Sequence, residues 1–303
     1  MKRIYKLDDF KISFENILSR DVLPLMAEYE RERRGKIWLG VVISIIILAV
    51  SFFTSYILLA LIILLWLVID CLYQRNTELY MPVLMRLIPA FSYFRISVLT
   101  LEDIKLSRLF PRNLSMNMLT KFQFFNSFTG IFSDTHVDVT KFAYSYLSRK
   151  SNFNIFQGTI VRIKTDNYFQ GTICIRPRNS NYYSITDLKE DNFEKVQVKD
   201  SVFTGLYGVW SDNAALAEIA LTKEFVSAFN RFTKDSGSAI SYCSFYGNYI
   251  YVALTLKDFF NFCGLFTSLV KIQNYDLLYK NFAAILGFVN DLIEQNNKEE
   301  QQS

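Results

Sequence analysis

The longest apolar segment of the chain runs from Ile37 to Ile69, 33 positions without a charged residue. A bilayer core about 30 Å thick needs roughly 20 helical residues. A single helix over this run would be about 50 Å long. The pattern therefore predicts two helices with a tight turn near Thr54 and Ser55, forming a transmembrane helical hairpin over residues 37–73. The alternative is a buried helical hairpin of a soluble protein.

Charged residues close this run on both sides, with Lys36 before it and Asp70 after it. Lys and Arg near membrane ends favour the cytoplasmic side. The basic residues at 31–36 and at Arg75, Arg86 and Arg95 therefore predict two spans with both termini in the cytoplasm. The expected location is the cell inner membrane, and Asp70 is interpreted as interfacial.

The segments on either side of the run have helical patterns. Residues 1–36 predict a helical leader, because Phe10, Phe14 and Ile17 recur at helical spacing. Pro24 is expected to break or restart this helix. The leader either lies on the membrane as an amphipathic helix or packs against the rest of the protein. Residues 74–130 predict a helical connector.

The hydrophobic period changes from helical to alternating at about residue 137, which is typical of strands. Residues 155–163 and 168–176 predict a hairpin that turns at 165–167. Further strands are expected near 194–199, 202–210, 240–245 and 249–256. The last two flank Gly247-Asn248, a short hairpin signal.

Helices are interleaved with these strands. Ser211-Asp212-Asn213 carries side-chain oxygens suited to a helix cap, and Thr222 is a second candidate cap. Residues 272–295 predict the last helix. The fold class expected is a membrane-anchored α+β protein. It combines the transmembrane hairpin with a cytosolic α+β domain over residues 131–296, which has a largely antiparallel sheet and a C-terminal helix. Residues 297–303 form a polar tail.

Four groups of residues resemble a bacterial membrane-protein family known only as domain of unknown function 3137. Pro24-Leu25 followed by Glu28, Glu30, Arg31 and Arg33 is similar to its leader. The other groups are Ser107 to Phe110, the pair Phe156-Gln157-Gly158 and Phe169-Gln170-Gly171, and Val202 to Asp212 followed by Ala217, Leu221, Thr222 and Phe225. Lys223 stands where the family has Pro. The resemblance implies a membrane-anchored cytosolic domain and supplies no activity.

The amino-acid composition excludes some classes of protein. The chain has 303 residues, of which 51% are hydrophobic and 20% charged, and a net charge of +4. These values exclude a disordered chain, which needs low hydrophobicity and high net charge. The four Cys show no CxxC pairing. This favours reduced, packed thiols over zinc ligands or a disulfide scaffold.

The candidate residues for acid–base catalysis are His136, the only histidine, and the nearby Asp134 and Asp138. A carboxylate and a histidine are the parts that a hydrolase uses for acid–base work. Membrane-anchored hydrolysis at Asp134, His136 and Asp138 is therefore one alternative function. No P-loop or GxGxxG pattern is present. We expect no cofactor, no metal ion and no catalytic residue.

Basic residues on the predicted hairpin suggest a surface that binds anions. Arg162, Lys164, Arg176 and Arg178 lie beside many aromatics, as in a nucleic-acid site. The net charge is too small for that partner, so no nucleic acid is expected. Anionic lipid headgroups are the alternative.

The sequence-based hypothesis is a non-enzymatic inner-membrane protein whose cytosolic domain binds a protein partner or the membrane surface. Tyrosines suit such interfaces, and those considered are Tyr182, Tyr183, Tyr242, Tyr246 and Tyr251. A membrane-anchored enzyme and an accessory subunit of a transport complex are the alternatives.

Overall fold

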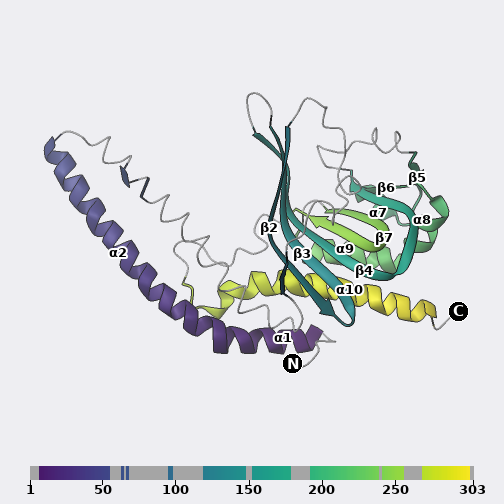
Figure 1. The fold of residues 1–303 in the computed structure, drawn as a ribbon, viewed down its shortest axis with the longest axis horizontal. Coiled ribbons are helices and arrows are strands. Elements are labelled where there is room, and N and C mark those ends of the chain that lie inside the picture. Colours follow the sequence, from purple (N-terminus) through teal and green to yellow (C-terminus); the bar gives the residue numbers. More distant parts are fainter. Residues whose placement is uncertain are drawn as a thin grey trace. The chain divides into compact units, whose positions relative to one another are not determined.

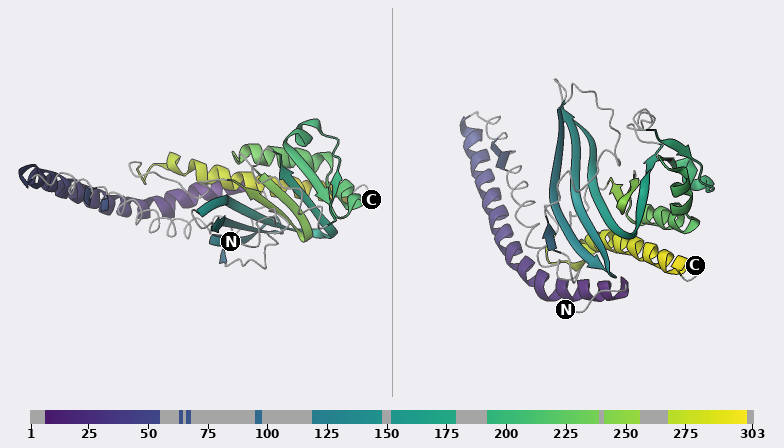
Figure 2. Two further views of the ribbon diagram at one scale, coloured as in Figure 1. Left: turned by 90° about the horizontal axis from the view of Figure 1, so that it is seen from above. Right: turned by 45° about the vertical axis from the view of Figure 1, so that its right-hand side comes forward.

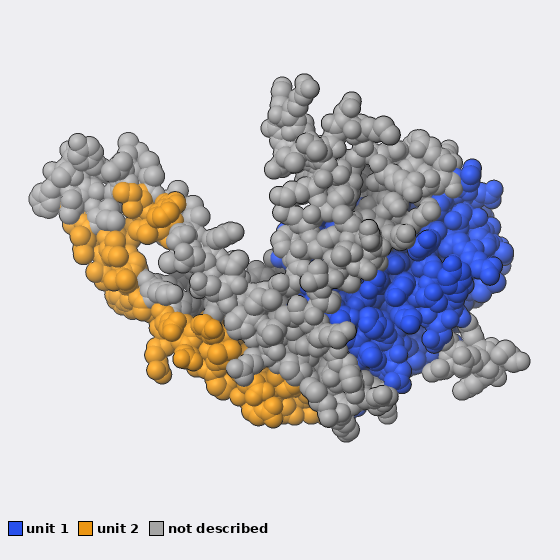
Figure 3. Space-filling view, viewed as in Figure 1, with its two compact units in different colours: residues 1–10, 91–259, 279–303 blue, residues 11–90, 260–278 orange. Residues whose placement is uncertain are grey.

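The structure is a computed structural model of the chain. It describes residues 7–54, 63–64, 66–67, 95–97, 119–147, 152–178, 192–238, 241–255 and 268–300. The chain divides into two compact units (Figure 3). Unit 1 comprises Met1–Phe10, Phe91–Phe259 and Tyr279–Ser303, and unit 2 comprises Lys11–Ala90 and Phe260–Leu278.

The N-terminal helices follow one another without a break in the backbone. Helix α1 spans Leu7–Ile17, the π-helical turn η1 spans Leu18–Val22, and α2 spans Leu23–Thr54. Pro24 is the second residue of α2. A proline is tolerated in the first turn of a helix, where its missing N–H has no intrahelical partner. The interruption expected at Pro24 is a π-helical turn just before it, and the helical backbone continues from that turn into α2.

The transmembrane hairpin predicted from the apolar run is wrong. Among the described residues, no helix combines the length and the apolar character that crossing a bilayer requires. Helix α2 begins at Leu23, inside the charged leader, and passes through the expected boundary at residue 37. Counting uncharged positions did not locate this helix, because the start of a helix depends on its caps and contacts. Most of the predicted second helix lies outside the described residues.

In the described part of unit 1, seven strands form an antiparallel sheet, so the α+β class with a largely antiparallel sheet is confirmed. The strand order is β1-β2-β3-β4-β6-β5, and β7 also pairs with β4. The strands are Arg95–Ser97 (β1), Leu119–Phe132 (β2), Thr135–Leu147 (β3), Asn152–Pro177 (β4), Glu194–Val196 (β5), Tyr207–Ser211 (β6) and Ser241–Leu254 (β7). Strands β2, β3 and β4 run side by side (Figures 1 and 2).

Strand β4 is continuous over 26 residues and contains both halves of the predicted hairpin. The turn expected at 165–167 is instead an irregular stretch of β4. The facing stretch of β7 has fewer residues. Lys164 pairs with Tyr249, and Phe169 pairs with Gly247. Gly247 has φ +59°, a conformation that glycine adopts without a steric penalty. The Gly247-Asn248 signal therefore marks an irregularity inside β7, and the predicted hairpin between 245 and 249 is wrong.

Two helices in unit 1 confirm the two predicted caps. Helix α8 (Ala214–Ala220) is capped by Asn213, and α9 (Lys223–Asp235) is capped by Thr222. The predicted strand over 202–210 is only partly right. Residues Ser201–Leu206 form helix α7, whose first turn is capped by Asp200, and the strand β6 begins at Tyr207.

The C-terminal helix α10 (Asp276–Glu300) follows the 3-10 turn η3 (Ile272–Tyr275), close to the predicted bounds. It extends into the segment expected to be a polar tail. Aromatic rings join it to α9. Phe232 stacks on Phe288 with ring centroids 4.7 Å apart, and Phe225 of α9 meets Phe245 of β7 at 4.9 Å. Through these contacts α9 packs against both the sheet and α10.

The segment predicted as a helical connector contains strands. Both β1 and most of β2 fall within residues 74–130, and the remainder of that segment lies outside the described residues. The register of β2 against β3 shifts between Phe124 and Ser127, which marks a β-bulge in β2. The predicted domain boundaries stay predictions.

Candidate functional site

A polar row crosses four neighbouring strands of the sheet. Thr129 of β2 lies opposite Asp138 of β3, Asp138 lies opposite Arg162 of β4, and Arg162 lies opposite Tyr251 of β7. Side chains alternate between the two faces of a strand. The register therefore puts all four on one face, while their neighbours Val137, Val139, Val161 and Val252 form an apolar layer on the other. These valines are fully buried.

The centre of the polar row is a buried ion pair. The Arg162 Nε atom lies 2.7 Å from the Asp138 Oδ2 atom, and Asp138 is 1% exposed. The guanidinium carbon of Arg162 is 4.9 Å from the centroid of the Tyr249 ring, a cation–π contact. Burial lowers the pKa of Arg162, but the charge and hydrogen bond of Asp138 outweigh it and raise the pKa above its usual value.

His136 adjoins this pair. Its Nδ1 atom is 3.6 Å from the Asp138 Oδ2 atom, and its Nε2 atom is 3.1 Å from the Thr129 hydroxyl. Asp134 is not part of the group. It is exposed in the turn between β2 and β3, with φ 66°. The structure therefore brings together two of the three residues of the hydrolase hypothesis and adds Arg162, which sequence reasoning had assigned to a basic surface.

The row also contains a buried phenol. Tyr251 is 4% exposed, and burial, partly offset by the positive charge of Arg162, raises its pKa to about 12. Within the part of the chain that the structure describes, the Oδ1 atom of Asp138 has no hydrogen-bond partner. Among the described residues, no group of three or more His, Cys, Asp or Glu side chains is arranged to hold a metal ion. Since Arg162 already occupies Oδ2 of the carboxylate, the geometry is that of a pair that holds strands together.

Helix α2 presents a second kind of surface. Large apolar side chains are exposed along residues 38–46, which we call the apolar segment. Trp38 is 69% exposed, Leu39 61% and Ile45 60%, and Val41, Val42, Ile43 and Ile46 are exposed as well. Exposed hydrophobic residues are ordinary when scattered, whereas a contiguous patch indicates an interaction surface. The sequence predicts an apolar run here, but as part of a transmembrane hairpin and not as an exposed surface.

The helix before the apolar segment is anchored within unit 2. Glu30 is buried, and its Oε2 atom accepts a hydrogen bond from the backbone N–H of Leu269 at 3.2 Å. Its Oε1 atom accepts from Arg34 at 3.2 Å. Tyr275 donates from its hydroxyl to the Leu269 carbonyl at 2.9 Å. These bonds hold the charged part of α2 and leave the apolar segment beyond it.

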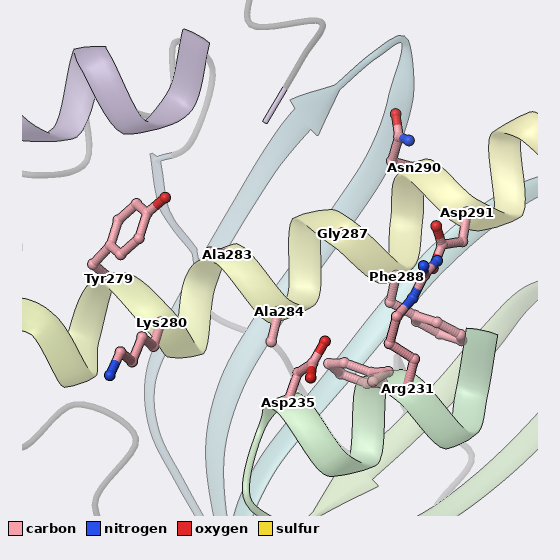
Figure 4. A pocket seen from close by; sticks show the side chains of 11 residues that line it. Arg231, Asp235, Tyr279, Lys280, Ala283, Ala284, Gly287, Phe288, Asn290 and Asp291 are labelled. Atoms are coloured by element: carbon pink, nitrogen blue, oxygen red, sulfur yellow. The ribbon is translucent and has the colours of Figure 1, made fainter. Parts of the chain in front are cut away.

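A groove runs between α9 and α10 within unit 1. It encloses about 490 Å³ and is floored by Ala283, Ala284 and Gly287 of α10 beside the stacked rings of Phe232 and Phe288. Arg231 of α9 points toward Asp291 of α10 and forms an ion pair with it (Figure 4). A second hollow of about 390 Å³ continues from this pair toward Glu294.

The remaining residues named from the sequence have varied positions. Arg176 is 1% exposed, Lys164 is exposed, and Arg178 donates to the Tyr207 carbonyl at 3.2 Å. Cys174 and Cys243 are buried, and burial raises the pKa of the Cys243 thiol well above its usual value. Asp70, Tyr182 and Tyr183 lie outside the described residues, as do the remaining two cysteines, Cys71 and Cys263.

Sequence comparison links part of the chain to a family. Residues 154–293 match the sequence model of a family described as "Protein of unknown function (DUF3137)". The match begins in β4 and ends in α10, and it covers less than half of the chain. The resemblance noted from the sequence is confirmed for this part. The leader motif at residues 24–33 and the group Ser107 to Phe110 lie outside it. Comparison with curated proteins finds no match.

Among solved structures, the chain is similar to the crystal structure of the mycobacterial trehalose monomycolate transport factor A, TtfA. The two are 11% identical over 64% of this chain and 88% of that chain, with a TM-score of 0.32. A similarity of this size supports no conclusion about function.

Proposed function

We propose that this protein binds the surface of an anionic lipid membrane through the apolar segment of α2 and presents its α+β unit to a partner. The observation that supports the proposal is the exposure of seven large apolar side chains within nine consecutive residues of one helix. Burying such side chains is worth about 1.5–3 kcal/mol each. Leaving them in water is unfavourable, so an apolar surrounding is expected.

The width of the exposed surface favours lipid over a protein groove. At 100° per residue, the seven side chains cover about 200° around the helix axis, centred on Val42. A helix that packs against a protein typically presents an apolar stripe about 100° wide. Lipid tails contact a helix over whatever arc is presented to them. The wide arc therefore fits acyl chains better than it fits a single protein surface.

The remaining side of the segment is compatible with an apolar medium. It carries Gly40 and Ser44, and the Ser44 hydroxyl donates to the Gly40 carbonyl at 2.7 Å. A serine whose hydroxyl is satisfied within its own helix needs no water there. The polar atom on this side of the segment therefore has a partner already.

Basic residues adjoin the segment. The sequence places Arg31, Arg33, Arg34 and Lys36 just before Trp38, and Arg31 and Arg34 are exposed. Basic residues near an anionic leaflet contribute about 1 kcal/mol each, and Trp favours the level of the lipid headgroups. Because the cytoplasmic leaflet is the anionic one, we propose the cytoplasmic face of the inner membrane as the location.

Vesicle flotation of the full-length protein tests the proposal. We expect the protein to float with vesicles that contain phosphatidylglycerol, and to float less with vesicles of phosphatidylcholine alone or at high salt. The double variant Ile45→Asp/Ile46→Asp is expected to lose most of the binding, because it puts two charges into the apolar segment.

The matched control is Ile219→Asp. Ile219 of α8 is 73% exposed, so the same change is made on an exposed helix position of unit 1. We expect this variant to bind vesicles like the parent protein. Equal flotation of the α2 double variant and the parent, or no flotation of the parent, would refute the proposal.

A further inference from the structure

We propose that two copies of this chain associate through α10, packed antiparallel around a two-fold axis at Gly287. The proposal rests on the groove between α9 and α10 and is independent of lipid binding. The floor of the groove is made of small residues. An added Cβ at Gly287 would meet no atom of the described residues within 4 Å, so a partner has room to approach the backbone there.

The open face of α10 is symmetric about Gly287. The face consists of Lys280, Ala283, Ala284, Asn290, Asp291 and Glu294, at positions −7, −4, −3, +3, +4 and +7 from the glycine. At 100° per residue, all of them lie within about 60° of Gly287 around the helix axis. A two-fold axis through Gly287 brings this face onto itself.

The charges on this face select the antiparallel arrangement. Lys280 and Glu294 are exposed, and each lies about 10 Å along the axis from Gly287, in opposite directions. Antiparallel pairing sets Lys280 of each copy against Glu294 of the other, with Asp291 one turn away. Parallel pairing would set Lys280 against Lys280 and Glu294 against Glu294. Like charges repel, so only the antiparallel pair is complementary.

The small residues permit the distance that helix pairing requires. Helices in contact have axes about 8–10 Å apart, and the distance depends on the side chains between them. Ala284 would face Asn290 of the partner, and Ala283 would face Asp291. Asp291 stays in place because Arg231 binds it from α9. The stacked Phe232 and Phe288 rings line the groove beside these small residues and hold α9 against α10.

A second copy fits this face better than an unrelated protein. An isologous interface requires the same patch to be complementary to itself. Few helix faces meet that condition, because it needs opposite charges at mirrored positions and small residues at the centre. This face has a lysine at −7, a glutamate at +7 and glycine at the centre.

Charge reversal tests the pairing in the full-length protein, kept in mild nonionic detergent. The mass from light scattering is expected to be that of a dimer. We expect Lys280→Glu to weaken the dimer about ten-fold, because each reversal acts at two symmetric contacts. The double variant Lys280→Glu/Glu294→Lys is expected to restore it. A parallel pair would be unaffected by the single reversal, so loss followed by rescue identifies the antiparallel pair.

Cross-linking locates the axis. Under mild oxidation, Gly287→Cys is expected to give a disulfide-linked dimer on a nonreducing gel. Gly205→Cys is the matched control, because Gly205 in α7 is likewise open to an added Cβ and lies off the proposed interface. A monomeric parent, equal cross-linking of both variants, or failure of the double reversal to restore the dimer would overturn the proposal.

Discussion

Asp138 and Arg162 illustrate how side chains far apart in sequence come to depend on one another. They are 24 positions apart and meet because β3 and β4 pair in one register. Removing one member of a buried pair leaves the other charge without compensation, which costs more than the pair itself contributes. The two residues therefore matter for stability whatever else the polar row does.

We predict that Arg162→Ala lowers the free energy of unfolding by about 3–5 kcal/mol, because it leaves the Asp138 carboxylate buried and unpaired. The double variant Arg162→Ala/Asp138→Ala is expected to recover part of this loss. Urea unfolding followed by circular dichroism measures both changes.

The exposed carboxylate of the same segment provides the control. Asp134→Asn is expected to change the free energy of unfolding by less than about 0.5 kcal/mol, because Asn also tolerates the positive φ found there. Losses of similar size in Arg162→Ala and Asp134→Asn would contradict the assignment of Asp138 to a buried pair.

Tyr251 predicts a dependence of stability on alkaline pH. Its pKa rises from 10.0 in the unfolded chain to about 12 in the folded protein, chiefly through burial. The folded state therefore favours the neutral phenol. This contribution to stability is fully present below about pH 10 and is lost as the pH rises through about 12. To isolate the contribution of Tyr251, the unfolding midpoints of the parent and of Tyr251→Phe are compared at about pH 9 and about pH 12. The parent should lose more stability than the variant.

At the scale of elements, the start of α9 shows a local signal that is confirmed. Thr222 Oγ1 accepts a hydrogen bond from the Phe225 N–H at 3.1 Å and another from Gln295 of α10 at 2.7 Å. The cap therefore satisfies a backbone donor and also joins α9 to α10. Lys223, the departure from the family pattern, does not prevent a sharp start.

We predict that Thr222→Ala destabilises the protein by about 1–2 kcal/mol, through loss of the N-cap and of the bond to Gln295. Ser227→Ala is the matched control. Ser227 is an exposed residue of the same helix, where alanine has the higher helix propensity, so the change is expected to be neutral or slightly stabilising. Thermal unfolding of both variants measures the difference, and equal effects would contradict the capping role.

Strands β4 and β7 show where local signals mislead. The polar stretch 165–167 in β4 and Gly247-Asn248 in β7 predicted two hairpins. Both strands continue through these positions. Each strand pairs with the other over both of its halves. A glycine permits either a turn or a bulge, and the choice depends on the partner strand, which a local pattern does not contain.

At the scale of the molecule, the two proposed surfaces belong to different units. The apolar segment lies in unit 2, and the open face of α10 lies in unit 1. The vesicle and dimer experiments therefore test separate parts of the chain, and failure of one leaves the other standing. The polar row lies inside the sheet of unit 1, and its predicted effects concern stability.

The sequence by itself determined the local features of this protein: the caps at Asn213 and Thr222, the C-terminal helix, the α+β class and the position of the apolar run. Each depends on a few neighbouring residues, so a short window is enough to read it. Only the tertiary structure decided that β4 is one strand, that Asp138 pairs with Arg162, and that α2 continues from the charged leader through residue 37. These depend on strand register and on contacts between distant segments, whose energy no local pattern records.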